Sequence, residues 1–161
     1  MRLLPFLLLV PLAGCVAPPT SAPAPRVATT PPPAPRPAPA PAPLATDWRD
    51  WSLTPGAWRY ADGVASFGAP GADRLELRCA AGRQLMVTRP GSGAGTVTLR
   101  TTSGTRTFAA AGGTITLAAN DPGIDAMGFS RGRFVLEQNG AAPLVVPVAP
   151  EVLRVAEDCR G

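Results

Sequence analysis

From residue 64 onward, short apolar segments alternate with glycine-containing turns, and several segments place apolar and polar residues at every second position. In the clearest case, Leu75 and Leu77 alternate with Arg74, Glu76 and Arg78. A period of two with one polar face is typical of antiparallel sheet. The pattern predicts strands over residues 64–67, 74–79, 84–89, 96–101, 106–109, 114–117, 133–137 and 144–148.

The turns between these segments predict how the strands are connected. Glycine occurs in the connections at 81–82, 90–95, 103–104 and 139–140. Short glycine-containing turns usually join neighbouring antiparallel strands as hairpins. We therefore expect the strands from 64 to 117 to follow one another as a meander.

Two short helices complete the predicted fold. Asp121 followed by Pro122 is typical of a helix start, with the carboxylate as N-cap and proline in the first turn. From Pro150, the apolar residues 152, 153, 155 and 156 fall on one side of a helix. The fold class predicted is mainly β: a small antiparallel β sandwich or open barrel with a short helix near 122–129 and a C-terminal helix.

The chain begins with a different pattern. After Arg2 comes the apolar run LLPFLLLVPL at residues 3–12, which has the length of a signal-peptide core. It is shorter than the about 20 residues of a membrane-spanning helix, and its two prolines disfavour a helix. The run ends in Leu12-Ala13-Gly14-Cys15, which resembles the lipobox of bacterial lipoproteins.

The resemblance implies a lipoprotein signal peptide at 1–14, cleavage before Cys15, a diacylglycerol on the Cys15 sulfur and an acyl chain such as palmitate on the new N-terminus. An ordinary secreted leader with a chance cysteine is the alternative. Val16 stands where some lipoproteins carry an inner-membrane retention aspartate. We therefore expect an outer-membrane anchor with the domain facing the periplasm, or alternatively the cell surface.

Residues 15–45 are expected to be a disordered tether. The stretch 17–46 holds 12 of the chain's 21 prolines and almost no residue able to form a core. Such composition favours extended polyproline II, so the tether is either a stalk that lifts the domain off the membrane or a low-complexity linker without a selected role. The remainder, 46–161, has the length of one domain.

Composition excludes several functions. All 15 basic residues are arginine. Residues 46–161 contain 12 of them and 11 carboxylates, so the domain lacks the excess of positive charge that nucleic-acid binding requires. Without histidine or lysine, serine triads and lysine bases are excluded. Of the close carboxylates, Asp121 is explained by helix capping and Asp125 by its place in the positive first turn of the helix. We expect no enzyme, no catalytic residue, no cofactor and no metal.

The cysteines predict one disulfide. With Cys15 lipidated, Cys79 and Cys159 remain as an even pair in an oxidising compartment. Cys79 continues the parity of the preceding apolar strand positions, and Cys159 continues the apolar helical stripe of 152 and 155. Both thiols are thus expected to face the core and to bond. Two buried free thiols are the alternative, and two sulfurs alone are too few for a metal site.

Candidate ligand-binding residues are an aromatic patch and a pair of arginines: Trp48, Trp51, Trp58, Tyr60, Arg131 and Arg133. Exposed aromatic rings stack on sugars and anchor protein interfaces, and paired arginines bind carboxylate or phosphate. Alternatively, Trp51 and Trp58 close one end of the sandwich and Trp48 ends the tether, and the arginines pair with Glu137 or Asp125.

A second resemblance covers the C-terminal part of the domain. The segment DAMGFSRGRF at 125–134, together with EDCR at 157–160, resembles uncharacterised lipoproteins of alphaproteobacteria, and it implies no particular activity.

The sequence therefore favours a lipid-anchored cell-envelope protein, non-enzymatic, acting as a structural or interaction module held off the membrane by a Pro-rich stalk. The alternative is a glycan- or peptidoglycan-binding lipoprotein that uses the aromatic cluster. The expected partners are the membrane, through the lipid, and peptidoglycan or an envelope protein.

Overall fold

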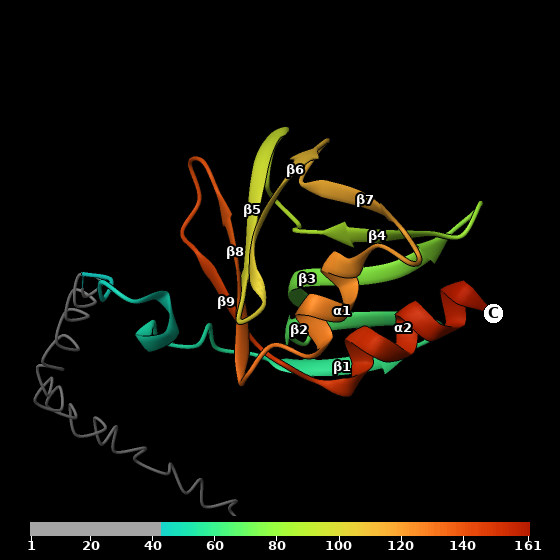
Figure 1. Cartoon of the computed structure of the whole chain (residues 1–161), viewed down its shortest axis with the longest axis horizontal. Coiled ribbons are helices and arrows are strands. Elements are labelled where there is room, and N and C mark those ends of the chain that lie inside the picture. Colours follow the sequence, from blue (N-terminus) through green and yellow to red (C-terminus); the bar gives the residue numbers. More distant parts are fainter. Residues whose placement is uncertain (1–42) are drawn as a thin grey trace, which may run out of the picture. The chain divides into compact units, whose positions relative to one another are not determined.

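A computed structural model describes residues 43–161, which form two antiparallel sheets and two α-helices (Figure 1). The leader, Cys15 and the tether up to residue 42 lie outside the described residues. One sheet has the order β1-β2-β3-β4-β7 and the other β6-β5-β8-β9. Their strands are β1 (Ala57–Ala61), β2 (Val64–Ala69), β3 (Ala72–Ala80), β4 (Gln84–Thr88), β5 (Gly95–Thr101), β6 (Gly104–Ala110), β7 (Thr114–Ala118), β8 (Arg133–Gln138) and β9 (Leu144–Pro147).

The helical elements are η1, a 3-10 helix at Trp48–Asp50, α1 at Pro122–Gly128 and α2 at Pro150–Arg160. The mainly β fold with two antiparallel sheets, a short helix and a C-terminal helix is confirmed. One strand, β1, was not predicted from the sequence. Its residues Trp58 and Tyr60 alternate with Arg59, as in a strand, but were interpreted only as an aromatic patch. No helix within residues 43–161 is both long and apolar enough to cross a membrane.

The predicted meander is wrong after β4. Strands β1 to β4 follow one another in one sheet, but β4 then pairs with β7, whereas β5 pairs with β6 and β8. The segment 90–95 therefore crosses between the sheets instead of forming a hairpin. Backbone hydrogen bonds from Arg89 N–H to the Gly113 carbonyl (2.9 Å) and from Gly113 N–H to the Gly93 carbonyl (2.8 Å) attach it to the chain before β7.

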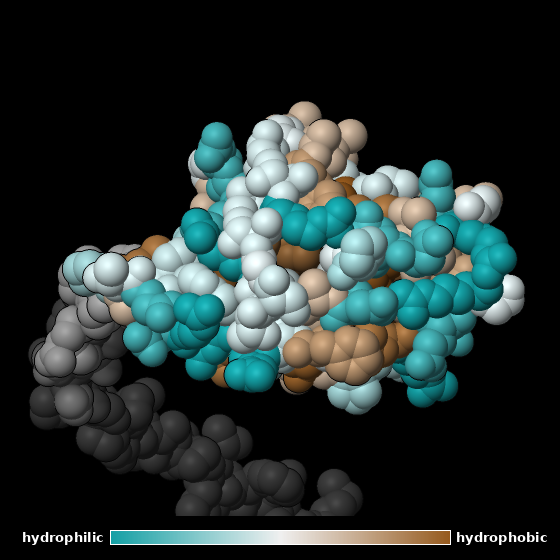
Figure 2. Space-filling model, in the orientation of Figure 1, coloured by the Kyte–Doolittle hydropathy of each residue, from teal (hydrophilic) through white to brown (hydrophobic). Residues whose placement is uncertain are grey.

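The two sheets and the two helices share one apolar core. Helix α2 contributes Val152, Val155, Ala156 and Cys159 to it, and α1 contributes Ile124 and Met127. Gly128 ends α1 against α2 with no space for a side chain, because a Cβ there would lie 2.3 Å from Leu153 Cδ2. Hydrophilic residues cover much of the face in Figure 2, and hydrophobic residues reach the surface between β5 and α1.

The disulfide is the pair expected from the sequence. The Cys79 and Cys159 sulfurs are 2.06 Å apart, and their Cα atoms 5.2 Å. Cys159 is buried, but Cys79 is exposed, so the prediction that both thiols face the core is wrong for Cys79. Cys79 keeps the parity of the buried leucines, but it lies next to the last residue of β3, where the strand reaches the edge of the core.

We predict that replacing the disulfide (Cys79→Ser with Cys159→Ala) lowers the free energy of unfolding by about 4 kcal/mol, because the bond closes a long loop and restricts the unfolded chain. The two cysteines are 80 positions apart. Urea unfolding of residues 43–161 measures this. A reducing agent should destabilise the wild type equally and leave the double variant unchanged; sensitivity of that variant to reductant would contradict the prediction.

Asp121 caps α1, accepting a hydrogen bond of 2.7 Å from Gly123 N–H and an ion pair from Arg106. Partial burial would raise the pKa of Asp121, but the Arg106 hydrogen bond, the Gly123 N–H and the Arg106 charge together lower it below its usual 3.8. The carboxylate's contribution to stability is therefore complete above the unfolded pKa and lost as pH falls through the folded pKa.

We expect Asp121→Ala to cost about 1 kcal/mol of unfolding free energy at pH 7, the usual effect of losing an N-cap. The difference from wild type should shrink as pH falls below about 4. Urea unfolding at a series of pH values measures both effects. Glu157→Ala, on the exposed face of α2, is the control; a pH-independent difference for Asp121→Ala would contradict this account.

Candidate functional site

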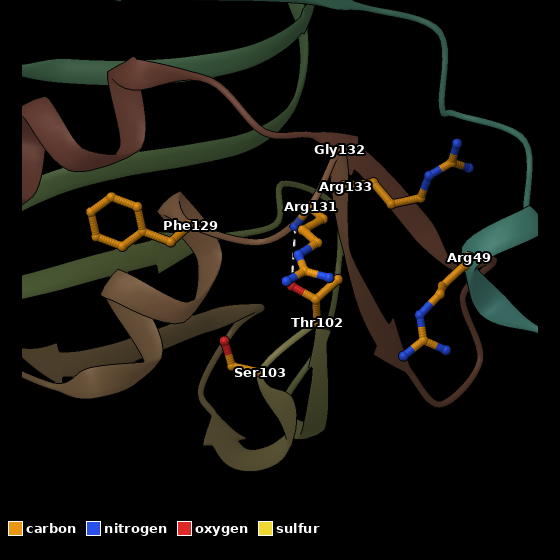
Figure 3. Close-up of a pocket in the computed structure, with 7 residues that line it drawn as sticks. All are labelled: Arg49, Thr102, Ser103, Phe129, Arg131, Gly132 and Arg133. Atoms are coloured by element: carbon orange, nitrogen blue, oxygen red, sulfur yellow. Dashed lines mark hydrogen bonds between the residues drawn. The ribbon is translucent and has the colours of Figure 1, made fainter.

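Three arginines surround one surface hollow of about 620 Å³ (Figure 3). We call it the arginine hollow; it is lined by Arg49, Thr102, Ser103, Phe129, Arg131, Gly132 and Arg133. The volume falls within the roughly 300–1,000 Å³ of small-molecule sites. Two of the arginines, Arg131 and Arg133, are candidates from the sequence, and Arg49 is an addition from the structure.

Four chain segments build the arginine hollow. Arg49 comes from η1, Thr102 and Ser103 form the turn between β5 and β6, Phe129 follows the end of α1, and residues 131–133 lead into β8. Residues far apart in sequence therefore meet here because the β5–β6 turn lies against the loop between α1 and β8 (Figure 3).

A buried serine holds that loop against the turn. Ser130 is only 4% exposed. Its hydroxyl accepts a hydrogen bond of 3.1 Å from Thr102 N–H and donates one of 2.5 Å to the Arg133 carbonyl. In return, Arg131 N–H donates to the Thr102 hydroxyl over 3.1 Å. These bonds fix the backbone on both sides of Arg131, so its side chain starts from a defined position.

The charge of the arginine hollow is positive, since no carboxylate lines it. The Arg133 guanidinium donates to the Trp51 carbonyl, and Arg49 pairs with Asp47 at 3.3 Å. Both members of the Arg49–Asp47 pair are exposed, so the pair contributes little energy. The guanidinium of Arg131 is exposed and has no hydrogen-bond or ion-pair partner among residues 43–161. It is the arginine best placed to bind a ligand anion.

The ion pairs considered for Arg131 and Arg133 are wrong. Glu137 pairs with Arg100, and Asp125 pairs with Arg160 at 2.8 Å. The physical reason is tertiary: β5 lies beside β8 and brings Arg100 to Glu137, and the end of α2 brings Arg160 to α1.

The aromatic candidates divide into two pairs, and none of the four lines the arginine hollow. Trp58 and Tyr60 on β1 pack against the core. The indole N–H of Trp58 donates to the Pro147 carbonyl over 2.8 Å, and the Tyr60 hydroxyl donates to Asp158. These contacts favour the interpretation of both residues as structural.

The other two aromatic residues lie at η1: Trp48 is its first residue, and Trp51 directly follows its last. The indole N–H of Trp51 donates to the Ala45 carbonyl over 2.7 Å, and the Arg49 guanidinium lies 4.8 Å from the centre of the Trp48 ring. All three indoles of the chain are partly buried. One face of Trp48 is thus covered by its own neighbour, which leaves less ring surface for a sugar.

Phe129, the aromatic residue that lines the arginine hollow, was not among the candidates predicted from the sequence. It is 70% exposed and lies on the rim of the arginine hollow (Figure 3). Its position in the sequence could have indicated exposure, because the buried residues of α1 include 124 and 127 and residue 129 does not continue that buried stripe. Arg49 carried no comparable signal, because its neighbours in WRDW indicate aromatic packing rather than a charge cluster.

The arrangement provides positive charge, hydroxyl groups and one aromatic ring. Such a set binds anions through charge-assisted hydrogen bonds, but guanidinium groups remain charged and do not act as bases in proteins. Among residues 43–161, no three histidine, cysteine, aspartate or glutamate side chains gather as metal ligands. Comparison with known protein families, curated proteins and solved structures finds no match to this chain.

We predict that Ser130→Ala lowers the free energy of unfolding by about 1 kcal/mol, because the partly buried Thr102 N–H and the Arg133 carbonyl both lose their hydrogen-bond partner. Urea unfolding measures the change. Ser103→Ala, which removes an exposed hydroxyl from the same turn, is the matched control and should be neutral. Equal stability of the two variants would show that the Ser130 link is dispensable.

Proposed function

We propose that this chain is a lipid-anchored cell-envelope protein whose β domain is a non-enzymatic structural or interaction module. The observation that carries the proposal is the sequence Leu12-Ala13-Gly14-Cys15 at the end of an apolar run. A leader of this length followed by a cysteine supports lipidation, and the Pro-rich tether that follows supports a domain held at a distance from the membrane.

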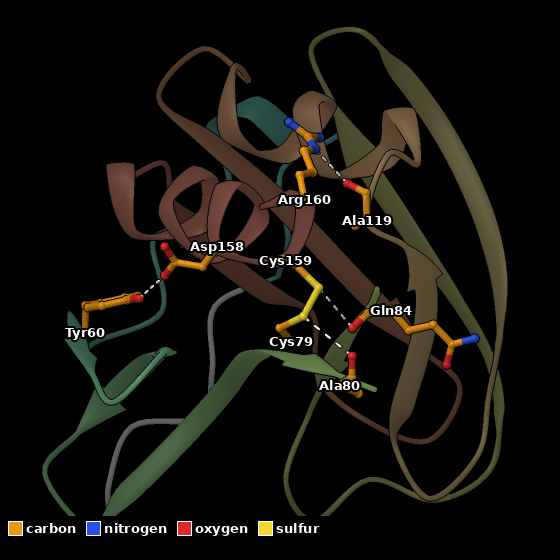
Figure 4. The surroundings of a disulfide bond; sticks show 8 residues. All are labelled: Tyr60, Cys79, Ala80, Gln84, Ala119, Asp158, Cys159 and Arg160. Carbon is orange, nitrogen blue, oxygen red and sulfur yellow. Dashed lines mark hydrogen bonds between the residues drawn. A yellow bond between two sulfur atoms is a disulfide. The ribbon is translucent and has the colours of Figure 1, made fainter. Parts of the chain in front are cut away.

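The disulfide supports the compartment. Disulfide bonds persist in oxidising compartments such as the periplasm and are rare where thiols are kept reduced. Here the bond joins the end of β3 to α2, with the Cys159 sulfur 3.4 Å from the Gln84 carbonyl oxygen on β4 (Figure 4). A domain closed in this way suits the space outside the cytoplasm.

The arginine hollow supports an interaction role over a purely structural one. Its exposed Arg131 and Phe129 make few contacts within the domain, which is expected of groups that bind a partner. The glycan-binding alternative receives less support, because Trp58 and Tyr60 are engaged with the core and Trp48 is covered by Arg49.

We predict that the full chain, produced in a lipoprotein-processing bacterium fed an alkyne analogue of palmitate, acquires the label and partitions into detergent. Cys15→Ala should lose both properties, since the thiol that receives the lipid is gone. In-gel fluorescence and phase separation provide the measurement. The variant Cys79→Ser with Cys159→Ala should keep the label; labelling that survives Cys15→Ala would overturn the proposed anchor.

A further inference from the structure

A second hollow of about 250 Å³ lies next to the arginine hollow and shares Ser103 with it. We call it the apolar slot. It lies between the β5–β6 turn and α1, and Leu99, Pro122 and Ala126 provide apolar parts of its lining. Hydrophobic residues reach the surface in this region between β5 and α1 (Figure 2). One turn of the chain thus separates a cationic hollow from an apolar one.

The charges of the two hollows differ although each contains arginine. Arg106 lines the apolar slot, but its guanidinium is paired with Asp121 and also lies 5.0 Å from the Phe108 ring centre. Arg131 has no such partner among the described residues. The positive charge open to a ligand is therefore concentrated on the Arg131 side of Ser103, and the other side offers mainly contact surface.

Phe129 adds exposed apolar surface to the rim of the arginine hollow. It follows α1, the helix that supplies Pro122 and Ala126 to the apolar slot, and it lies on the rim of the arginine hollow with 70% of its surface exposed. Figure 3 shows the Phe129 ring pointing away from Arg131, so the hollow presents its apolar ring and its unpaired guanidinium at separate places on the rim. This separation matches a ligand with one charged and one apolar part.

We propose that the arginine hollow and the apolar slot form one site for an anionic amphiphile, a molecule such as a phospholipid that joins a phosphate to a hydrocarbon. Arg131 and Arg49 bind the phosphate oxygens, and the hydrocarbon contacts Phe129 and enters the slot. This proposal names the class of ligand that the proposed interaction module would bind. It depends on the proposed function only for the compartment in which the protein would meet that ligand.

Competing ligands use less of the site. Inorganic phosphate would engage the arginines but leave Phe129 and the apolar slot uncovered. A sugar chain needs open aromatic faces, and no aromatic residue lines the apolar slot. Thr101, Ser103, Thr105 and Arg106 line it beside Leu99, Pro122 and Ala126. An amphiphile uses both halves, and the burial of its hydrocarbon adds apolar free energy to the charge interaction.

The test uses residues 43–161 with the disulfide formed, because every buried residue of the core lies between Ala65 and Cys159. Calorimetric titration with dodecyl phosphate, below the concentration at which it forms micelles, gives the affinity. Amide NMR shifts locate the site. We expect shifts at Ser103, Ala126 and Arg131, and weaker binding of inorganic phosphate and of the uncharged amphiphile dodecyl maltoside.

Variants at three exposed positions test which side chains bind the ligand. Arg131→Gln should weaken dodecyl phosphate binding by about tenfold, the effect of losing one charge-assisted hydrogen bond. Phe129→Ser should weaken binding of dodecyl phosphate but not of inorganic phosphate. Arg78→Gln on β3, which removes one exposed arginine outside the two hollows, is the matched control and should leave binding unchanged.

Several results would overturn the proposal. Equal affinity for inorganic and dodecyl phosphate would reduce the site to an anion site, and equal affinity for dodecyl maltoside would remove the role of charge. Equal losses in Arg131→Gln and Arg78→Gln would mean unspecific attraction. Retention on peptidoglycan without binding of dodecyl phosphate would favour the glycan alternative. None of these results affects the palmitate labelling of Cys15, so this proposal and the proposed anchor fail separately.

Discussion

The packing of α2 on the first sheet is the interaction on which the rest of the domain depends. Val152, Val155 and Ala156 have no exposed surface, and full burial of a valine side chain contributes roughly 1.5–3 kcal/mol. The helix contacts β1, β2, β3 and β4 as well as α1. The helix therefore covers one face of strands that are joined to one another by backbone hydrogen bonds. The disulfide at the C-terminal end of the helix attaches it to β3.

The position of α1 follows from that packing. Gly128 allows close approach to Leu153 of α2, and the Arg160 side chain at the end of α2 reaches Asp125 and the Ala119 carbonyl. Once α1 is fixed, the loop that leaves it must pass the β5–β6 turn, where Ser130 bonds to Thr102. The exposed Arg131 and Phe129 are thus presented by a rigid base, which reduces the entropy that a ligand would cost the protein.

The positive charge of the arginine hollow comes from arginine side chains alone. Guanidinium groups stay protonated over the whole range in which carboxylates titrate, so the positive charge of the arginine hollow does not change with pH. A planar guanidinium also binds two oxygens of one phosphate or carboxylate. Combined with the proposed lipid anchor and Pro-rich tether, this gives a tethered domain with a constant attraction for anionic groups and an apolar slot beside the positive charge.

The sequence by itself determined the local elements of this protein. Alternation in 74–79 and 96–101, the Asp121-Pro122 start and the stripe 152, 155 and 159 depend only on backbone periodicity and capping. The strands other than β1, the two α-helices and the cysteine pair could therefore be predicted. It did not determine the partners of the strands, because β4 presents the same alternating pattern to β5 and to β7. It also could not identify the site. Arg49, Ser103 and Phe129 meet Arg131 only when η1, α1 and the sheet that holds β5, β6 and β8 are packed together. Only tertiary packing decides that Glu137 and Asp125 are already paired with other arginines, leaving Arg131 exposed.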